Sequence, residues 1–497
     1  MSVELMEKYI RYRSKDPKKL EKQLLNANPE FLQLLSQKKA LYIFNKAVNE
    51  IELYKKFLRK NQVVVQSIKT IADFRKKIPI MDKENYIKEA KDIRELCFNK
   101  DISKINILFE SSGYTGKPSI WPKTKEEEEQ EKKYVTVGLD IIYKTYDKRT
   151  LFINTFALGS WVTGVELARI SDGHCTLINP GPNEGEVYEI IKNFSKDFDQ
   201  FIIAGYPPFI KNLIDKGGSI INWKEHTIHF LLGAEGMPEE LRDYIFEQVG
   251  EKAIVMSGYG ASDIGITGIN ETKETVLIRR LARDNPQFNK EIFNGHHRSL
   301  PMLFQYDPLS YFIEVNEKNE LVFTTININI AMPLIRYNLK DTGGVISYDK
   351  MTDVLKRHKI DIKFEFPFPF MYLIGRSDGA INFFGSLVYP NFINGVIYKN
   401  KKLRSKTTNN FKLSVKYDKE HKPILSIDIQ LKKGVKKSKM LSRSFERLIE
   451  SEMFDKIEDL LPKKKLLSKM YKQSIIKVRL YSFDKYPYIS GIKIKYK

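Results

Sequence analysis

Cysteine is scarce in this sequence, and long apolar runs are absent. Only Cys97 and Cys175 occur among 497 residues, and neither belongs to a Cys-x-x-Cys pair. A disulfide framework is therefore excluded, and a reducing, cytoplasmic location is expected. No run of about 18 apolar residues is present, which excludes a transmembrane helix. The stretch from Met1 to Glu21 lacks an apolar segment, so no secretory signal is expected.

Acidic residues are outnumbered by basic ones. The chain has 83 Lys and Arg against 62 Asp and Glu, a formal net charge of +21. Part of the excess lies in three C-terminal clusters: Lys399, Lys401, Lys402, Arg404 and Lys406; Lys432, Lys433, Lys436, Lys437 and Lys439; and Lys463 to Lys465. Such clusters suit a phosphate-bearing partner, or they serve solubility in a lysine-rich chain. They lack the interleaved aromatic residues of a single-strand nucleic-acid site, so nucleic acid is the less favoured partner.

The first half of the chain changes its apolar pattern near residue 105. Residues 1–100 show helical spacing, with leucines recurring among Lys and Glu. Residues 105–260 alternate strand-like and helix-like runs, which is typical of βαβ units around a mostly parallel sheet. The acidic run at 126–129 opens a helix and is interpreted as a solvated face.

The second half favours strands and ends in a smaller module. Residues 300–345 contain strand-like runs at 312–315, 321–328 and 334–337. After residue 375 the sequence predicts a hairpin over 412–431, a helix over 445–461 and a strand over 474–481. The fold class predicted is therefore α/β: a large N-terminal domain with mixed or parallel sheets and flanking helices, and a small α+β C-terminal domain.

A loop of small polar residues follows the first strand-like run. The apolar residues 105–109 lead into Glu110-Ser-Ser-Gly-Tyr-Thr-Gly-Lys-Pro-Ser119. Gly113 and Gly116 let backbone N–H groups turn toward one point, and the hydroxyls and Lys117 add donors and a charge there. Such a loop suits a polyphosphate. The spacing of the two glycines excludes a kinase-type P-loop, and an ordinary loop is the competing interpretation.

This loop resembles the phosphate-binding loop of adenylate-forming enzymes, Ser/Thr-Ser/Thr-Gly-Ser/Thr-Thr-Gly-x-Pro. It is most similar to the phenylacetate–CoA ligase branch, which lacks a second lysine after the proline; Ser119 stands there, and Tyr114 replaces a small hydroxyl residue. Residues 78–86 resemble the N-terminal part of that branch and show no chemistry of their own. The resemblance implies that the phosphates are held by Ser111, Ser112, Gly113, Thr115, Gly116 and Lys117.

Two further turns resemble the adenine-binding turns of this family. Gly233-Ala-Glu-Gly236 follows an apolar run and resembles the turn that backs the adenine ring, and the segment from Ser257 to Asp263 resembles the Tyr-Gly-x-Thr/Ser-Glu signature. The first of these turns alone is as readily an ordinary strand–helix connection. The resemblance implies that Asp263, in place of the usual glutamate, holds Mg²⁺. It also implies that the nucleotide is bound by Gly233, Ala234, Glu235, Tyr259, Gly260 and, near the α-phosphate, Ser262.

Two later segments resemble the ribose site and the hinge of the family. Met332-Pro-Leu-Ile-Arg-Tyr-Asn-Leu-Lys-Asp341 is similar to Pro-Leu-Ile-Arg-Tyr-Arg-Thr-Gly-Asp, so Asp341 is implied to accept both ribose hydroxyls, for which a carboxylate has two acceptors. In Gly375-Arg-Ser-Asp378, Arg376 is implied to contact ribose or the α-phosphate, and Asp378 is the implied pivot. The domains predicted are a large adenylation core (1–374), a hinge (375–379) and a small mobile lid (380–497).

The end of the chain resembles the terminal Pro-x-x-x-Gly-Lys motif, whose lysine drives adenylation. Ile492 follows Gly491, so Lys493 is assigned that role, and Lys495 shares its face in an extended strand. An exposed terminal strand is the competing interpretation. Together with Arg376 and Asp263, Lys493 completes the implied catalytic set.

The resemblance implies a two-step reaction. A carboxylic acid reacts with ATP to give an acyl-adenylate and pyrophosphate, and a thiol, most often that of coenzyme A, then displaces AMP. The implied cofactors are ATP, Mg²⁺ and coenzyme A; zinc is not predicted, because the Cys/His cluster of zinc-containing relatives is missing. The acid's pocket is assigned to Trp161, Tyr206, Phe209 and Gly258, and its three aromatic rings suit an aromatic or medium-sized apolar acid.

Three alternatives stay open from the sequence. The acyl group could pass to an amine or to a carrier protein instead of coenzyme A. The differences at Tyr114, Asp263 and Ile492 allow a catalytically degenerate relative. A basic nucleic-acid-binding protein is the alternative from a different class. The oligomeric state, a homodimer included, is also open.

Overall fold

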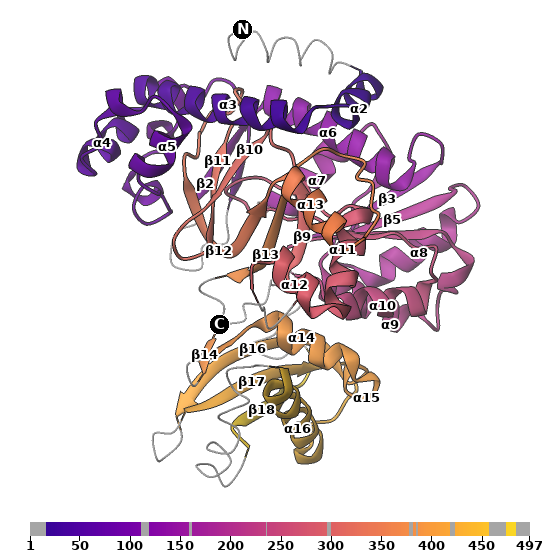
Figure 1. Cartoon of the computed structure of the whole chain (residues 1–497). Coiled ribbons are helices and arrows are strands. Elements are labelled where there is room, and N and C mark those ends of the chain that lie inside the picture. Colours follow the sequence, from indigo (N-terminus) through magenta and orange to yellow (C-terminus); the bar gives the residue numbers. More distant parts are fainter. Residues whose placement is uncertain are drawn as a thin grey trace.

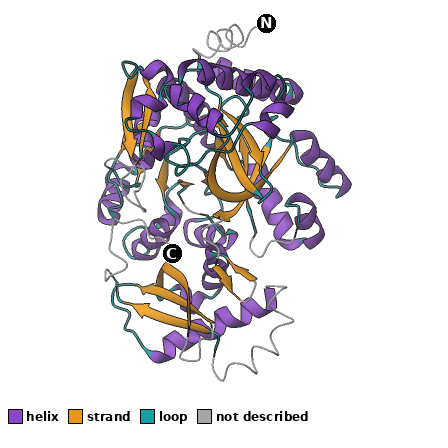
Figure 2. Ribbon diagram, turned by 90° about the vertical axis from the view of Figure 1, so that its left-hand side faces the viewer, coloured by secondary structure: helices purple, strands orange, loops and turns teal. Residues whose placement is uncertain are grey.

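The protein has a large N-terminal part and a smaller C-terminal part, one above the other in Figure 1. The computed structural model describes residues 16–110, 119–158, 162–234, 236–295, 300–376, 381–383, 386–417, 423–456 and 474–483. Figure 2 shows the same two parts from the side, with helices packed around the strands of each. Within those ranges no helix is long and apolar enough to cross a bilayer. The predicted α/β class with a larger and a smaller unit is confirmed.

Helices and 3₁₀ turns form most of residues 17–100, as the leucine spacing predicts. Their starts are encoded locally: Asn28 Oδ1 accepts the Phe31 N–H at 2.9 Å, and Thr70 and Asp73 form a capping box. The long helix α3 lies across the strands β10 and β11 at the top of Figure 1. The elements are α2 (Pro17–Leu25), α3 (Pro29–Glu50), α4 (Glu52–Lys60) and α5 (Ile71–Lys77), with short 3₁₀ turns at Val65–Ser67, Ile87–Glu89, Ile93–Leu96 and Phe98–Lys100.

Five parallel strands form the predicted βαβ sheet, in the order β4-β3-β5-β6-β7. Every residue of β3 and β5 is buried, which is why these strands are mostly apolar instead of alternating between apolar and polar residues. The carboxyl ends of β6 and β7 are neighbours, so the turns that follow them meet. The strands are β3 (Thr150–Asn154), β4 (Thr176–Ile178), β5 (Gln200–Gly205), β6 (Ile228–Leu232) and β7 (Val255–Ser257); the helices are α6 (Lys125–Tyr143), α7 (Val162–Ser171), α8 (Glu184–Phe194), α9 (Pro207–Gly217) and α10 (Glu239–Val249).

Six antiparallel strands form a second sheet, in the order β10-β11-β12-β13-β9-β8. The predicted strand at 334–337 is wrong, because β12 begins only at Tyr337, after a left-handed Arg336 (φ 51°), and continues to Ile346. Asp341 therefore lies within a strand. The elements are β8 (Ile269–Asn270), β9 (Met302–Tyr306), β10 (Tyr311–Val315), β11 (Glu320–Thr325), β12 (Tyr337–Ile346) and β13 (Phe370–Arg376), with α11 (Lys273–Asp284), α12 (Pro286–Ile292) and α13 (Tyr348–Arg357).

The C-terminal part has a separate apolar core, which includes Phe392, Phe411, Ile427 and Phe445. The predicted hairpin is confirmed as β16 and β17, and the strand at 476–481 pairs with β17 in parallel. The predicted helix begins earlier than expected, at Lys439. The elements are β14 (Ile381–Phe383), β15 (Ser386–Val388), α14 (Pro390–Lys399), α15 (Lys401–Arg404), β16 (Thr407–Tyr417), β17 (Pro423–Leu431), α16 (Lys439–Lys456) and β18 (Ile476–Tyr481).

The buried His229, in β6, is expected to make the stability of the parallel sheet depend on pH. Burial lowers the pKa of His229 from 6.5 to about 4. Its Nδ1 accepts the Ile254 N–H at 3.0 Å, and its Nε2 lies 3.2 Å from Gln200 Oε1, a pairing that suits the neutral ring. Between these two pKa values the unfolded chain binds a proton that the folded chain does not. The free energy of unfolding therefore falls as the pH falls through this window, by about 3 kcal/mol at most.

The prediction is tested by urea unfolding, followed by circular dichroism, at a series of pH values from about 7 down to about 4. His229→Gln is expected to lose less stability across this window than the unchanged protein. His226→Gln, at a half-buried histidine in the preceding turn, serves as the control and is expected to behave like the unchanged protein. An equal loss in His229→Gln and the unchanged protein would contradict the assignment.

Candidate functional site

The turns after β6 and β7 lie side by side. The Gly258 N–H donates to Leu232 O at 2.8 Å, and a Cβ on Gly233 would come 3.4 Å from Gly258 O. Gly260 has to be a glycine, because a Cβ there would lie 2.6 Å from the Ile266 Cα. Of the residues predicted to bind adenine, the structure thus brings together Gly233, Ala234, Tyr259 and Gly260; Glu235 lies outside the described residues.

Tyr259 and Asp341 meet, although 82 positions separate them in the sequence. The Tyr259 hydroxyl donates to Asp341 Oδ2 at 2.5 Å. Their exposed fractions are 9% and 7%. The Tyr259 ring stacks on Phe323 with centroids 6.0 Å apart and lies 6.1 Å from the Phe304 ring, so aromatic side chains hold it in place. A buried carboxylate held by a phenol is well placed to accept further hydroxyl donors.

Asp263 is held between a cation and a hydroxyl. Lys83 Nζ lies 3.2 Å from Oδ1, the Tyr337 hydroxyl donates to Oδ2 at 2.5 Å, and the side chain is 5% exposed. The Lys83 ammonium also lies 5.5 Å from the centre of the Trp121 ring. Sequence reasoning missed Lys83, Tyr337 and Trp121 as neighbours of Asp263. The only signal for Lys83 was the resemblance of residues 78–86 to the family, with no chemistry attached.

A pocket lies between the signature turn and the hairpin of β1 (Ile105–Glu110) and β2 (Ile120–Thr124). Glu110 pairs with Ile120, so residues 111–118 connect two strands at one end of this hairpin. The phosphate-binding residues predicted between Ser111 and Lys117 lie outside the described residues, so their role stays a prediction. The pocket is lined by Phe109, Trp121 and Lys123 from the hairpin and by Ser262, Asp263 and Gly265 from the turn.

Buried acidic residues contact Lys123, which lines the pocket. Lys123 Nζ lies 2.5 Å from Glu131 Oε1 and also contacts Glu166. Burial raises the pKa of Glu127 to about 8 and that of Glu166 to about 7, which limits the negative charge beside one lysine at neutral pH. The interpretation of residues 126–129 as a solvated face is wrong for Glu128, which is 9% exposed and pairs with Arg169, because this side of α6 packs on α7.

The ribose and hinge segments lie on neighbouring strands. Asp341 of β12 is opposite Arg376 of β13, and the Thr342 hydroxyl donates to Gly375 O at 2.9 Å. The side chain of Arg376 and the whole of Asp378 and Lys493 lie outside the described residues. Their roles, and the hinge and lid boundaries, stay predictions.

The aromatic residues assigned to the acid's pocket lie at the start of α9. Tyr206 stacks with Phe209 at a centroid distance of 6.2 Å. Tyr206 and Ala234 pack against the same apolar cluster around Phe156, so Tyr206 lies close to the predicted adenine turn. Phe209 is 5% exposed and belongs to the main core, which favours a packing role for it. Trp161 lies outside the described residues.

The C-terminal part reaches the same turn. Asn391, at the start of α14, lies against Gly236: a Cβ on that glycine would come 2.5 Å from the amide nitrogen of Asn391. Residues of both parts therefore converge on the segment that follows β6.

Comparison with solved structures identifies the fold. No protein-family model and no curated protein matches the sequence. A crystal structure of 2-hydroxyisobutyryl-CoA ligase in the postadenylation state, in complex with R3-HIB-AMP, matches with a TM-score of 0.63 over 93% of this chain and 87% of that chain, at 11% identity. The chain has the fold of this CoA ligase. The resemblance to adenylate-forming enzymes is thereby confirmed at the level of the fold, whereas the phenylacetate–CoA ligase branch stays a prediction.

The same ligase has been solved in other states, which match this chain less well. Its thioesterification state, in complex with 2-HIB-AMP and CoA, gives a TM-score of 0.52 at 11% identity over 94% of this chain and 88% of that chain. An open conformation with the same two ligands also gives 0.52, at 11% identity over 96% of this chain and 91% of that chain. The overall match is therefore better to the postadenylation state than to these two states.

Proposed function

We propose that this protein uses ATP to convert a carboxylic acid into an acyl-adenylate, with release of pyrophosphate, and then transfers the acyl group to a thiol. The single observation that carries the proposal is the hydrogen bond between Tyr259 and Asp341. This hydrogen bond joins the turn at 257–263 to the segment at 332–341, and both side chains are buried. This contact between two motifs identified independently in the sequence supports a single nucleotide site, on the fold of a CoA ligase.

The residues around Asp263 fit a magnesium ion that arrives with the nucleotide. Mg²⁺ is usually held by one or two carboxylates together with substrate phosphates and water, so a single aspartate is sufficient. Among the described residues, no group of three or more acidic, His or Cys side chains could hold a metal without the nucleotide. When bound, the ion would offset negative charge on the phosphates. The contact of Asp263 with Lys83 indicates that this carboxylate already faces a cation.

The chain's own residues would hold the nucleotide and neutralise charge. Asp341 would accept the ribose hydroxyls, and the turns at 233–234 and 258–260 would face the base. Lys83, beside Asp263, and Lys493 would contribute positive charge near the reacting phosphate, where an attacking carboxylate adds a second anion.

The acceptor is proposed to be coenzyme A, because the chain has the fold of a CoA ligase and its basic C-terminal part suits an anionic thiol. The finer assignment to the phenylacetate–CoA ligase branch rests on the loop between Ser111 and Ser119. Transfer to an amine or to a carrier-protein thiol remains the alternative.

The proposal is tested by measuring pyrophosphate release from MgATP with a panel of aromatic and short apolar acids, with and without coenzyme A. We expect release that depends on one class of acid and a matching thioester in the presence of coenzyme A. Acid-dependent release with capture by hydroxylamine but no thioester would indicate another acceptor. No acid-dependent release, together with binding of DNA or RNA at physiological salt, would overturn the proposal in favour of a nucleic-acid-binding role.

A further inference from the structure

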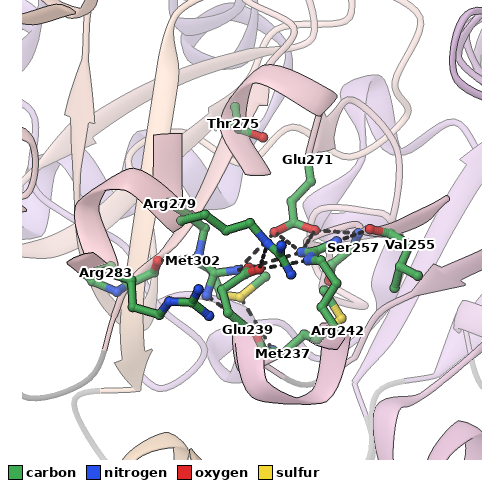
Figure 3. Close-up of polar contacts among 12 residues, drawn as sticks. Met237, Glu239, Arg242, Val255, Ser257, Glu271, Thr275, Arg279, Arg283 and Met302 are labelled. Atoms are coloured by element: carbon green, nitrogen blue, oxygen red, sulfur yellow. Dashed lines mark hydrogen bonds and ion pairs between the residues drawn. The ribbon is translucent and has the colours of Figure 1, made fainter. Parts of the chain in front are cut away.

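Two buried arginines and two buried glutamates lie directly behind the proposed adenine turns. We propose that Glu239, Arg242, Glu271 and Arg279, here called the charge quartet, are positioning residues that hold both turns in the geometry needed to bind the nucleotide. This inference rests on the proposed function. It goes further by assigning a role to four residues that no motif contains and that lie outside the pocket (Figure 3).

The quartet is a connected network, and the half-buried Arg280 adds one more contact, from its Nε to Glu239 Oε2 at 3.0 Å. Glu239 Oε1 lies 2.5 Å from Arg279 Nη1, and Glu239 Oε2 accepts from Arg242 Nε at 3.0 Å. Glu271 accepts from Arg242 Nη2 at 2.8 and 2.9 Å and from Arg279 Nη1 at 3.2 Å. Each of the four side chains is at most 1% exposed. Burial raises the pKa of Glu239, but Arg242 and Arg279 outweigh this and lower it to about 2, so Glu239 is charged at neutral pH.

Three of the four side chains also bind the backbone next to the two turns. Glu271 Oε2 accepts the Ser257 N–H at 2.8 Å, and Arg242 donates to Val255 O, which fixes β7 two residues before Tyr259. Arg279 donates to Met237 O at 3.2 Å, which fixes the segment after Ala234. One network therefore ties the turn after β6 to the turn after β7, as the dashed lines of Figure 3 show for these contacts.

Stability alone does not account for such a cluster. Burying four charges is expensive, and apolar side chains of similar volume often stabilise a fold as well or better. An ionic network adds geometric restraint, because planar guanidinium groups hold several carbonyl and carboxylate oxygens at defined angles. Here the network restrains the backbone that carries Tyr259, whose hydroxyl donates to Asp341. Loosening the quartet should therefore impair nucleotide binding before it impairs binding of the acid.

The test compares Glu271→Gln, which keeps the size and removes the charge, with Glu271→Asp, which keeps the charge. The control is Glu251→Gln, at an exposed glutamate just after α10. MgATP binding is measured by titration calorimetry without acid, and KM and kcat are measured for ATP and for the acid. For Glu271→Gln we expect about tenfold weaker ATP binding and a KM for the acid within about twofold of normal. Glu271→Asp is expected to recover part of the affinity, and Glu251→Gln to change nothing.

A merely structural role gives a different result. Partial unfolding lowers the concentration of active enzyme, so kcat per mole of protein falls while KM for ATP and the calorimetric Kd stay normal. That result, or equal changes in the KM of ATP and acid, would overturn the proposal. If Glu271→Gln does not fold, the charge-balanced variant Glu271→Gln with Arg242→Gln replaces it under the same criteria. Absence of MgATP binding in the unchanged protein would contradict the proposed function itself, so the two failures are distinguishable.

Discussion

Replacing Asp341 by asparagine is expected to weaken the binding of ATP by about a hundredfold. The change keeps the size of the side chain and removes its charge and one of its two acceptor oxygens. A hydrogen bond to a charged group contributes about 1.5–3 kcal/mol, and two ribose hydroxyls are proposed to donate to this carboxylate. Since about 1.4 kcal/mol corresponds to tenfold, the loss of one bond and the weakening of the other reach this magnitude.

The measurement is titration calorimetry with MgATP, supported by the KM for ATP. Asp349→Asn, an exposed aspartate at the start of α13, is the matched control and is expected to bind ATP normally. Tyr259→Phe is expected to have a smaller effect, because the carboxylate keeps its charge and loses only the phenol that orients it. Normal ATP affinity in Asp341→Asn would remove Asp341 from the nucleotide site.

The fold could be predicted wherever burial leaves a simple trace in the sequence. Strands β5 and β6 are mostly apolar because both faces of the parallel sheet are covered, and they lie in the region of alternating strands and helices predicted for residues 105–260. Strand β12 was misplaced because charged residues and two glycines interrupt its pattern. Gly343 is required there, since a Cβ would lie 2.0 Å from Tyr372 O on the neighbouring strand. Such a close approach of backbones has no counterpart in hydrophobic periodicity.

The site could be predicted where a short motif ends a strand, and not where charges from distant segments meet. The motifs contain Tyr259, Asp263 and Asp341. Lys83, in contrast, contacts Asp263 although it lies 180 positions earlier in the sequence. The charge quartet was missed for the same reason, because a buried arginine and an exposed one look alike in a sequence. The sequence also does not reveal the ion pairs of the first basic cluster. Lys401 and Arg404 pair with Glu247 of α10, so part of the excess positive charge is compensated by acidic residues of the same chain.

A second large effect is expected for Asp215, an acidic residue at the contact between the two parts of the chain. Asp215, near the end of α9, accepts from Lys211 Nζ at 2.8 Å and from Lys432 of the C-terminal part. The Tyr244 hydroxyl also donates to Asp215. Lys211 has no exposed side-chain surface, and it donates to Arg404 O of the C-terminal part at 3.1 Å. Burial lowers the pKa of Lys211 to about 8, against the opposing effect of Asp215.

Asp215→Asn is expected to shift the docking equilibrium of the C-terminal part by about a hundredfold toward the undocked form. The change leaves the buried Lys211 and its neighbour Lys432 without their counter-charge, and breaking a buried ion pair in this way costs about 3–5 kcal/mol. Undocking lets water reach both lysines and removes most of that cost. The surrounding pair of Lys401 and Glu247 is 77% and 45% exposed, so it contributes little and is screened by salt.

Small-angle X-ray scattering at low and high salt measures the docking. The unchanged protein is expected to keep its radius of gyration in about 0.5 M salt, because its central pair is buried, whereas Asp215→Asn expands, and more so at high salt. Asp197→Asn, an exposed aspartate in the same part of the chain, is the control. The proposed function adds a kinetic consequence, because the overall match of this chain is better to the postadenylation state of the ligase than to its thioesterification state. Asp215→Asn should therefore slow acid-dependent pyrophosphate release more than thioester formation from a synthetic acyl-adenylate. An unchanged radius together with equal slowing of both steps would show that Asp215 does not control docking.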